Sequence, residues 1–296
     1  MRCPDFIGSD RWKPEIKLIV SDMDGTLLDS QGRIREEFFV LFDELKSRDI
    51  MFIACSGRFY AQMVRSFQRV KGGLILIAHN GAVIQRSSFD KAMYERNLDA
   101  ELVKFALAQL YALDLDDAEI YLAAKDMAYT YNPSAALKAE FKQADVDFFE
   151  TSSLFLVDEG IKKIELFQQG GLTESTIAKV KAAFRGSSLE CVVSGRIWLD
   201  IMSVSINKGK ALSMIQERFR VAPENTMVFG DYYNDLDLFQ QAKYSFAMAN
   251  APAEVQKAAR FVAPDNDSNG VLSVIKNYLE EKSEFFYDGG RRELAY

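Results

Sequence analysis

The stretch KLIVSDMDGTLL, residues 17–28, predicts how the chain folds and where its reactive groups lie. Its apolar, β-branched first half is typical of a buried parallel strand, which ends at Asp22 and Asp24 before a Gly-Thr turn signal. Ligands of open α/β sheets bind outside the carboxyl ends of the strands. We therefore expect both carboxylates at a binding site, with an ordinary acidic turn as the alternative.

Helix-like and strand-like segments alternate after this first strand. Apolar residues recur at helical spacing in the helix-like segments, whereas the strand-like segments are short apolar runs. Such alternation predicts βα units and a parallel sheet. The helix-like segments are residues 34–47 and 59–70, and the strand-like segments are residues 50–54 and 74–78.

Two further strand ends carry polar groups. Ser56 and Gly57 lie between a strand and a helix, where a hydroxyl and backbone N–H groups favour phosphate, although an ordinary helix cap is the alternative. Residues 226–229 form another apolar strand, which leads into Asp231 and Asp235. Because parallel strands end at the same edge of a sheet, we expect these groups near the first two carboxylates.

The middle of the chain differs from both ends. Residues 86–193 contain short alternating segments separated by helical stretches, which predict a smaller α/β domain with an antiparallel sheet. This smaller domain, called the cap below, would be inserted into a larger one, called the core, of residues 1–85 and 194–296. For this core we predict an α/β fold with a doubly wound, mostly parallel, Rossmann-like sheet.

Composition excludes several classes of partner. The chain has 296 residues and 48% hydrophobic content, so it can bury a sizeable core. A net charge of -7 gives no electrostatic footprint for nucleic acid or an anionic membrane, and we expect neither as a partner. No apolar run approaches membrane-spanning length. A small phosphate ester would need local cations or a metal, and the oligomeric state stays open.

Cysteine and histidine usage narrows the chemistry. Cys3, Cys55 and Cys191 have no paired spacing, so we expect neither a disulfide framework nor a zinc site, and a reducing cytoplasm fits best. His79 is the single histidine. Serine-type triads and multi-histidine metal sites need histidine with further partners, which leaves carboxylates and lysines as acid-base groups. We expect a structural role for His79.

Two acidic runs and the C-terminal segment have simpler interpretations. Residues 114–117 lack the glycine and terminal glutamate of a calcium loop, and a solvated connector explains them. Residues 265–270 match the opening of an EF-hand loop, but Lys276 stands where the last ligand would be, so a polar loop before the last helix suffices. Residues 284–296 have no clear period and predict a tail or partner-docking segment.

Four motifs, taken together, give the chain a family resemblance. DMDGTL at 22–27, Ser56-Gly57-Arg58, Lys208 and GDYYND at 230–235 resemble, in that order, the motifs of the haloacid dehalogenase superfamily. The turn Asn80-Gly81-Ala82, residues 247–251 and the position of the insertion make the chain similar to the Cof-type phosphatases. Serine replaces the commoner threonine in the second motif, and tyrosines occupy the variable centre of the fourth. Neither change removes a needed functional group.

The resemblance implies a Mg²⁺-dependent phosphatase that hydrolyses small phosphorylated metabolites, with sugar phosphates as the substrate class. Asp22 would attack phosphorus and form an aspartyl-phosphate, while Asp24 would protonate the leaving oxygen and then activate water. Lys208 would limit the repulsion between Asp22 and the phosphoryl group, with Lys210 as a competing candidate.

The resemblance also implies which residues bind the phosphate and the metal ion. Ser56, Gly57 and Asn234 would hydrogen-bond the phosphate. Mg²⁺ would take oxygen ligands from the Asp22 carboxylate, the Asp24 backbone carbonyl and Asp231, which suits a hard octahedral cation. Asp235 would orient the site from behind these ligands, and Arg58 could simply cap a helix.

Two other functions compete with hydrolysis. A phosphomutase or phosphotransferase would use the same aspartyl-phosphate but pass it to a sugar. A non-catalytic sensor would bind phosphorylated metabolites in an intact pocket, although the complete set of acids argues against it. An ATP-driven pump is disfavoured because the sequence lacks a membrane span.

Overall fold

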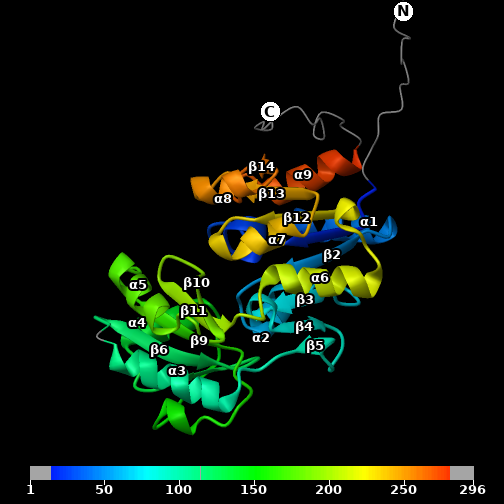
Figure 1. Ribbon diagram of the computed structural model, residues 1–296. Helices are drawn as coiled ribbons and strands as arrows, with labels where there is room; N and C mark the ends of the chain where they lie inside the picture. The colour runs from blue at the N-terminus through cyan, green and yellow to red at the C-terminus, as the bar shows by residue number, and fades with distance from the viewer. Residues whose placement is uncertain (1–14, 114, 281–296) are drawn as a thin grey trace, which may run out of the picture.

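The computed structural model describes residues 15–113 and 115–280, which form an α/β fold with two separate β-sheets (Figure 1). The tail expected at residues 284–296 and Cys3 lie outside these residues. Both ends of the described chain contribute to the larger sheet, and the middle forms the smaller sheet. The chain therefore leaves the larger sheet, builds the smaller one and returns.

Within the described residues, the larger sheet has eight strands in the order β14-β13-β12-β1-β2-β3-β4-β5. Strand β1 pairs in parallel with β2 on one side and with β12 on the other. The strands from β14 to β3 are parallel, whereas β4 and β5 are antiparallel additions at one edge. The strands are β1 Leu18–Ser21, β2 Met51–Cys55, β3 Ile75–Ala78, β4 Val83–Arg86, β5 Tyr94–Glu95, β12 Thr226–Gly230, β13 Tyr244–Met248 and β14 Phe261–Ala263.

Helices cover both faces of the larger sheet (Figure 1). Ile19 packs in a cluster with α1, α2 and α9, while Leu18 and Val20 pack with α6, α7 and α8 on the opposite face. Burial on two faces explains why β1 is apolar throughout and confirms the predicted doubly wound sheet. The helices are α1 Glu36–Ser47, α2 Tyr60–Ser66, α6 Lys208–Phe219, α7 Leu236–Gln240, α8 Ala253–Ala258 and α9 Gly270–Leu279.

The smaller sheet of the described chain has six strands in the order β10-β11-β9-β6-β7-β8. Its pairs are antiparallel except for β7 with β8. Helices α3 and α5 pack in one hydrophobic cluster, and α4 packs in another. The elements are α3 Ala100–Ala112, β6 Ala118–Ala123, β7 Ala128–Thr130, α4 Ala135–Gln143, β8 Phe148–Glu150, β9 Lys163–Gln168, α5 Glu174–Ala183, β10 Leu189–Val193 and β11 Trp198–Ser203.

Strand membership differs from the boundaries expected at 85/86 and 193/194. Strand β5 pairs with β4 in the larger sheet, about ten residues beyond the first expected boundary. Strand β11 pairs with β10 and β9 in the smaller sheet, although it follows the second expected boundary. That boundary lies in the turn of the β10–β11 hairpin, where a turn signal does not mean a change of domain.

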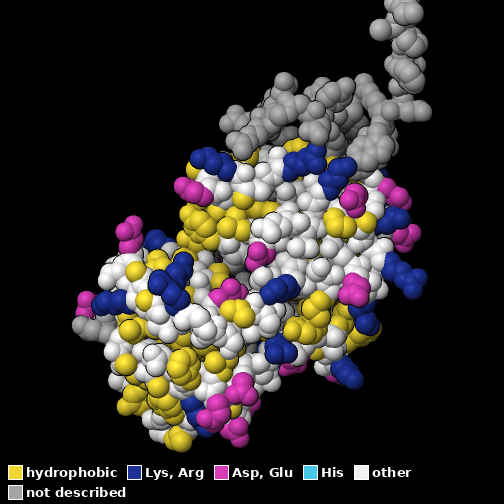
Figure 2. All heavy atoms as spheres, in the orientation of Figure 1, with side chains coloured by type: hydrophobic (Ala, Val, Ile, Leu, Met, Phe, Trp, Pro, Cys, Tyr) yellow, Lys and Arg dark blue, Asp and Glu magenta, His cyan; other side chains and the backbone are white. Residues whose placement is uncertain are grey.

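Among the described residues, no helix is both long and apolar enough to cross a membrane. The surface is indented where the part built on the smaller sheet meets the rest of the molecule (Figure 2). Cys55 is buried and Cys191 half-buried, and both are free thiols.

Candidate active site

The candidate site lies at the carboxyl ends of β1, β2 and β12, in a pocket of about 450 Å³. The pocket is lined by loops that follow strands of the larger sheet and by residues of β6, β9 and β11 in the smaller sheet. Its lining includes the following residues expected at the site from the sequence: Asp22, Asp24, Ser56, Gly57, Asp231 and Asn234.

Lys208 lies directly behind this lining as the first residue of α6. Its Nζ donates to Asp22 Oδ1 at 2.6 Å and to Asp235 Oδ1 at 2.7 Å, and its side chain is fully buried. Burial opposes the charged form of Lys208, but the two carboxylates hold its pKa above the ordinary value. Lys210 instead is exposed and donates to the Val204 carbonyl at 2.7 Å. The geometry thus separates the two candidate lysines.

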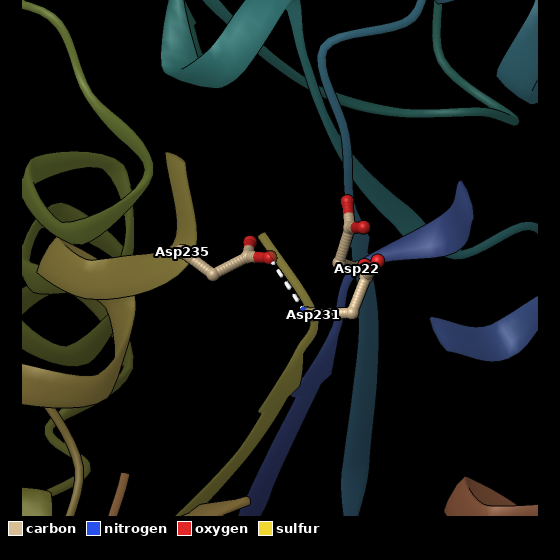
Figure 3. Close-up of side chains that lie close together, drawn as sticks. All are labelled: Asp22, Asp231 and Asp235. Carbon is tan, nitrogen blue, oxygen red and sulfur yellow. Dashed lines mark hydrogen bonds between the residues drawn. The ribbon is translucent and has the colours of Figure 1, made fainter. Parts of the chain in front are cut away.

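Asp235 orders the loop that follows β12. Its Oδ2 accepts hydrogen bonds from the backbone N–H of Asp231 at 2.9 Å and of Tyr232 at 3.0 Å, the first of which is drawn in Figure 3. Its Oδ1 accepts from Lys208. Because both oxygens already have protein partners, Asp235 positions its neighbours and has little capacity left for a metal.

Asp22 and Asp231 offer the oxygen atoms for a metal. Together with Asp235 they form a cluster whose ligand atoms lie within 4.8 Å of one another (Figure 3). Burial raises the pKa of Asp22 well above its ordinary value in spite of Lys208. Burial and the neighbouring Asp235 raise the pKa of Asp231 to about 7. This concentration of hard oxygen donors with excess negative charge fits a divalent cation such as Mg²⁺.

Thr26 holds the Asp231 carboxylate in place. Its hydroxyl donates to Asp231 Oδ1 at 2.8 Å across 205 positions of sequence, and its side chain is buried. Gly25 adds a steric reason for this arrangement, because a Cβ atom at that position would lie 2.3 Å from Asp231 Oδ2. The Gly-Thr pair that the sequence presents as a turn therefore also packs against the metal-binding candidate.

Asp24 faces Arg58 across the pocket. The Arg58 guanidinium donates from Nε to Asp24 Oδ2 at 2.7 Å and from a terminal nitrogen to Oδ1 at 2.6 Å. Such a bidentate ion pair fixes the orientation of the carboxylate. The N-cap residue of α2 is Phe59. Arg58 therefore does not cap the helix, and it pairs with Asp24 instead.

Ser56, Gly57 and Asn234 form the side of the pocket expected to bind phosphate. Ser56 is buried, and its Oγ accepts from the Arg58 backbone N–H at 3.2 Å. Asn234 donates from Nδ2 to Asn80 Oδ1 at 3.1 Å. The structure thus brings hydroxyl and amide groups to the same pocket as Asp22.

Sequence reasoning missed a set of charged residues in the cap wall of the pocket. Lys163 and Glu165 lie on β9 and line the pocket, and Asp200 on β11 contacts Lys163 at 3.1 Å. Asn80 joins Asp200 to the core through a 2.6 Å hydrogen bond from its Nδ2. A signal existed in the sequence, since charged residues interrupt two apolar strands, but the contact between Lys163 and Asp200 joins positions that are 37 residues apart.

His79 does not line the pocket. It is buried, packs edge-on against Phe59 with ring centroids 5.0 Å apart, and its Nε2 lies 2.9 Å from the Lys125 carbonyl. Burial and nearby Lys163 lower its pKa to about 3, so the ring is neutral at ordinary pH. These contacts agree with the structural role expected from the sequence.

Comparison with known proteins identifies the family. A family model described as haloacid dehalogenase-like hydrolase matches residues 19–275. The chain belongs to this family. The resemblance seen in the sequence motifs is therefore confirmed, and the chain is an enzyme of the phosphoric monoester hydrolase type found in this superfamily.

Similar proteins share almost the whole length of the chain. The Escherichia coli (strain K12) protein named 5-amino-6-(5-phospho-D-ribitylamino)uracil phosphatase YbjI is 29% identical over 279 residues, covering 91% of this chain and 98% of that protein. The structure of SMU.1108c from Streptococcus mutans UA159 is 30% identical with a TM-score of 0.80, covering 90% of this chain and 99% of that one. A haloacid dehalogenase-like hydrolase from B. subtilis, 24% identical with a TM-score of 0.76, shares the fold over 88% of this chain and 99% of its own.

Proposed function

We propose that this haloacid dehalogenase-type enzyme is a Mg²⁺-dependent phosphatase that hydrolyses small phosphorylated metabolites, sugar phosphates foremost, through an aspartyl-phosphate on Asp22. The observation that carries the proposal is the buried Lys208 ammonium, which contacts Asp22 beside Asp231. This arrangement places a nucleophile, a fixed positive charge and oxygen ligands for a metal at one edge of the sheet.

In the first half of the reaction, the Asp22 carboxylate attacks phosphorus and the bond from phosphorus to the ester oxygen breaks. Lys208 lowers the repulsion between the Asp22 carboxylate and the phosphoryl oxygens, because its ammonium lies 2.6 Å from Asp22 Oδ1. Ser56, Gly57 and Asn234 hydrogen-bond the phosphoryl oxygens. Mg²⁺, held by Asp22, Asp231 and the Asp24 backbone carbonyl, would neutralise charge on the transferring group.

Asp24 performs the proton transfers in both halves. It gives a proton to the departing ester oxygen, and it then takes a proton from the water that attacks the aspartyl-phosphate, which returns Asp22 and releases phosphate. In this structure the Arg58 guanidinium donates to both oxygens of Asp24. This ion pair must therefore open before Asp24 can carry the proton that it gives to the ester oxygen.

The comparisons support small esters as substrates. The name of the E. coli relative specifies the phosphate ester of a ribitylamino-substituted uracil, a compound with a polyol chain. A pocket of about 450 Å³ accommodates leaving groups of this order of size. We also infer a cytoplasmic enzyme, because cysteines without paired spacing fit a reducing compartment. The net charge of -7 offers no attraction to nucleic acid or to an anionic membrane, so we infer neither as a partner.

Phosphate release from a panel of sugar and polyol phosphates, with a Mg²⁺ titration and an EDTA control, tests this function. We expect release that requires Mg²⁺ and is abolished in Asp22→Asn. Transfer of phosphate to a second sugar when a bisphosphate activator is present would favour a phosphomutase. Metabolite binding without any phosphate release in the wild-type protein would instead identify a sensor and overturn the proposal.

A further inference from the structure

Both cations in the pocket lining are already paired with carboxylates of the protein. The Arg58 guanidinium donates to the two oxygens of Asp24. The Lys163 ammonium donates to Glu165 at 2.8 Å and to Asp200 at 3.1 Å. The part of the lining that the structure describes contains no further lysine or arginine. The positive charge that faces the pocket is therefore balanced before a substrate binds.

Carboxyl groups outnumber these two cations in the lining. They belong to Asp22, Asp24, Glu140, Glu165 and Asp231. Asp22 accepts from Lys208 and Asp231 accepts from the Thr26 hydroxyl, and both belong to the cluster that fits a divalent cation. Glu140 is the exception, because its carboxylate makes no hydrogen bond or ion pair with any residue of 15–113 or 115–280.

Glu140 is placed where it can meet a ligand. It lies on α4 with its side chain half-buried, and it lines both the pocket of about 450 Å³ and a neighbouring cleft of about 790 Å³. Asp24 and Arg58 also line both spaces, so the two adjoin beside the proposed acid-base group. A carboxylate in this position can accept a hydrogen bond from a part of the leaving group beyond the ester oxygen.

A row of aromatic rings continues the pocket wall from Glu140. Phe141 follows it on α4 and packs edge-on against Tyr121, with ring centroids 5.0 Å apart. Tyr121 in turn packs edge-on against Trp198, with ring centroids 6.1 Å apart. All three rings line the pocket, and the half-buried Trp198 indole keeps accessible surface. The wall therefore combines an unpaired carboxylate with an aromatic surface.

This combination suits an organic cation. A protonated amine is attracted to the negative face of an aromatic ring, most strongly to tryptophan, and it also forms a charge-assisted hydrogen bond with a carboxylate. A hydroxyl group in the same place would form the hydrogen bond without either charge effect. Because Arg58 and Lys163 already have carboxylate partners, an ammonium group would meet little uncompensated positive charge from the lining.

We propose that Glu140 and Trp198 bind a protonated amino group on the leaving group, so that the enzyme prefers phosphate monoesters of amino compounds, such as amino sugars, to neutral esters of the same size. This inference rests on the proposed phosphatase function, and it adds a positive charge that most sugar phosphates do not carry. Glu140 and Trp198 are binding residues here, and the proton transfers stay with Asp24.

Glucosamine 6-phosphate and glucose 6-phosphate test the proposal with the wild-type enzyme. They differ at one carbon, which carries an amino group in the first and a hydroxyl in the second, and the amine is protonated at about pH 6.5. At saturating Mg²⁺, we expect kcat/KM to be about tenfold higher for glucosamine 6-phosphate, since the carboxylate and the indole each contribute about threefold.

The outcomes separate this inference from the proposed function. Equal values, a preference for glucose 6-phosphate, or release only from the neutral esters of the wider panel would overturn the inference and leave the phosphatase function standing. Absence of phosphate release from every ester would overturn the proposed function and this inference with it.

Two variants assign the preference to its residues. Glu140→Gln keeps the side-chain shape but removes the charge, whereas Trp198→Leu keeps an apolar side chain but removes the aromatic face. Each variant should lower the ratio of kcat/KM between the two esters by about threefold. Glu174→Gln is the control, because Glu174 is exposed in the first turn of α5 and lies outside the pocket lining. It should keep the wild-type ratio. An unchanged ratio in folded Glu140→Gln would contradict the assignment, and the wild-type pair decides the matter if that variant does not fold.

Discussion

At the scale of single residues, Lys208 is the group on which the other charges depend. Replacing it by methionine would leave Asp22 and Asp235 buried without their cation. We expect Lys208→Met to lose about 3–5 kcal/mol of unfolding free energy, as when one partner of a buried ion pair is removed. Phosphate release should fall by about 10² or more, because the pKa of Asp22 would rise further and the nucleophile would be neutral.

Lys210→Met is the matched control for this change. Lys210 lies two residues further along the same helix, is exposed, and contacts a backbone carbonyl. Urea unfolding and phosphate release should both stay close to wild type. Similar losses in the two variants would mean that the Lys208 contacts have no special role.

The two proton transfers assigned to Asp24 can be separated by the choice of leaving group. Asp24→Asn keeps the shape and the backbone carbonyl but removes the exchangeable proton. Cleavage of a sugar phosphate should fall by about 10² to 10⁴, whereas p-nitrophenolate leaves with little help. Stopped-flow assays with p-nitrophenyl phosphate should therefore show a burst of up to one product per enzyme, followed by slow turnover.

Asp22→Asn supplies the comparison for the burst. Without a nucleophile no aspartyl-phosphate forms, so the burst should be absent. Equal losses on both esters without a burst in Asp24→Asn would count against its dual role.

Glu165 gives the stability a defined dependence on pH. Its pKa is raised from an ordinary 4.5 to about 7 by burial, so between these values the folded protein keeps a proton that the unfolded chain releases. The unfolding free energy should therefore fall as pH rises through this interval, by on the order of 1–3 kcal/mol from this group. Urea unfolding in EDTA should show a flatter profile for Glu165→Gln than for wild type; parallel profiles would refute this origin.

Residues that belong to a recognisable motif could be found from sequence, whereas those defined by a distant partner could not. Asp22, Asp231 and Lys208 stand in motifs with distinctive neighbours, and the structure brings them together. Glu165 has no such motif. Its contacts with Lys163 and Tyr121, and its place in the pocket lining, become visible only in the folded chain.

At the scale of elements, the turn after β1 depends on Gly25. Its φ of +71° is left-handed, and an added Cβ would lie 2.3 Å from Asp231 Oδ2. Backbone strain alone would lower the unfolding free energy of Gly25→Ala by about 1–2 kcal/mol, and the clash with Asp231 should make the loss larger. We also expect Gly25→Ala to need a higher Mg²⁺ concentration for activity. The second effect follows because the clash displaces the Asp231 carboxylate.

Gly32→Ala isolates the backbone contribution. Gly32 has nearly the same φ of +72°, but no atom lies within 4 Å of the position of its Cβ. It should show the strain of about 1–2 kcal/mol without a change in Mg²⁺ dependence. If the two variants shift the magnesium titration alike, the contact between Gly25 and Asp231 does not govern metal binding.

Periodicity located most elements of the larger sheet because its buried strands are continuous apolar runs. Periodicity did not assign the strands that lie where the chain passes from one sheet to the other. Strand β5 has two residues, and β11 belongs to a hairpin whose turn resembles a domain boundary. Pairing across the sheet, rather than local composition, decides where such strands belong.

At the scale of the whole molecule, buried polar contacts connect the two sheets. Asn80 accepts from Asn234 in the core and donates to Asp200 in the cap, while Lys163 reaches back to the Gly57 carbonyl. Side chains after the larger sheet and on β9 and β11 of the smaller sheet are therefore joined through one network. A change that separates these two parts should impair both binding and chemistry, because residues of both line the pocket.

Asn80→Asp tests this coupling because it preserves shape and replaces a donor by a negative charge. One oxygen can still accept from Asn234, but the other faces the Asp200 carboxylate, where a 2.6 Å hydrogen bond becomes a repulsive contact. We expect a loss on the order of 3 kcal/mol in unfolding free energy, a larger radius of gyration by X-ray scattering and a higher KM.

Asn97→Asp makes the same exchange in the segment after β5, where the Asn97 oxygen accepts from Lys162. The new charge there faces a cation, so stability should change by less than about 1 kcal/mol. Equal expansion of both variants would show that added charge alone, and not the bond from Asn80 to Asp200, separates the cap from the core.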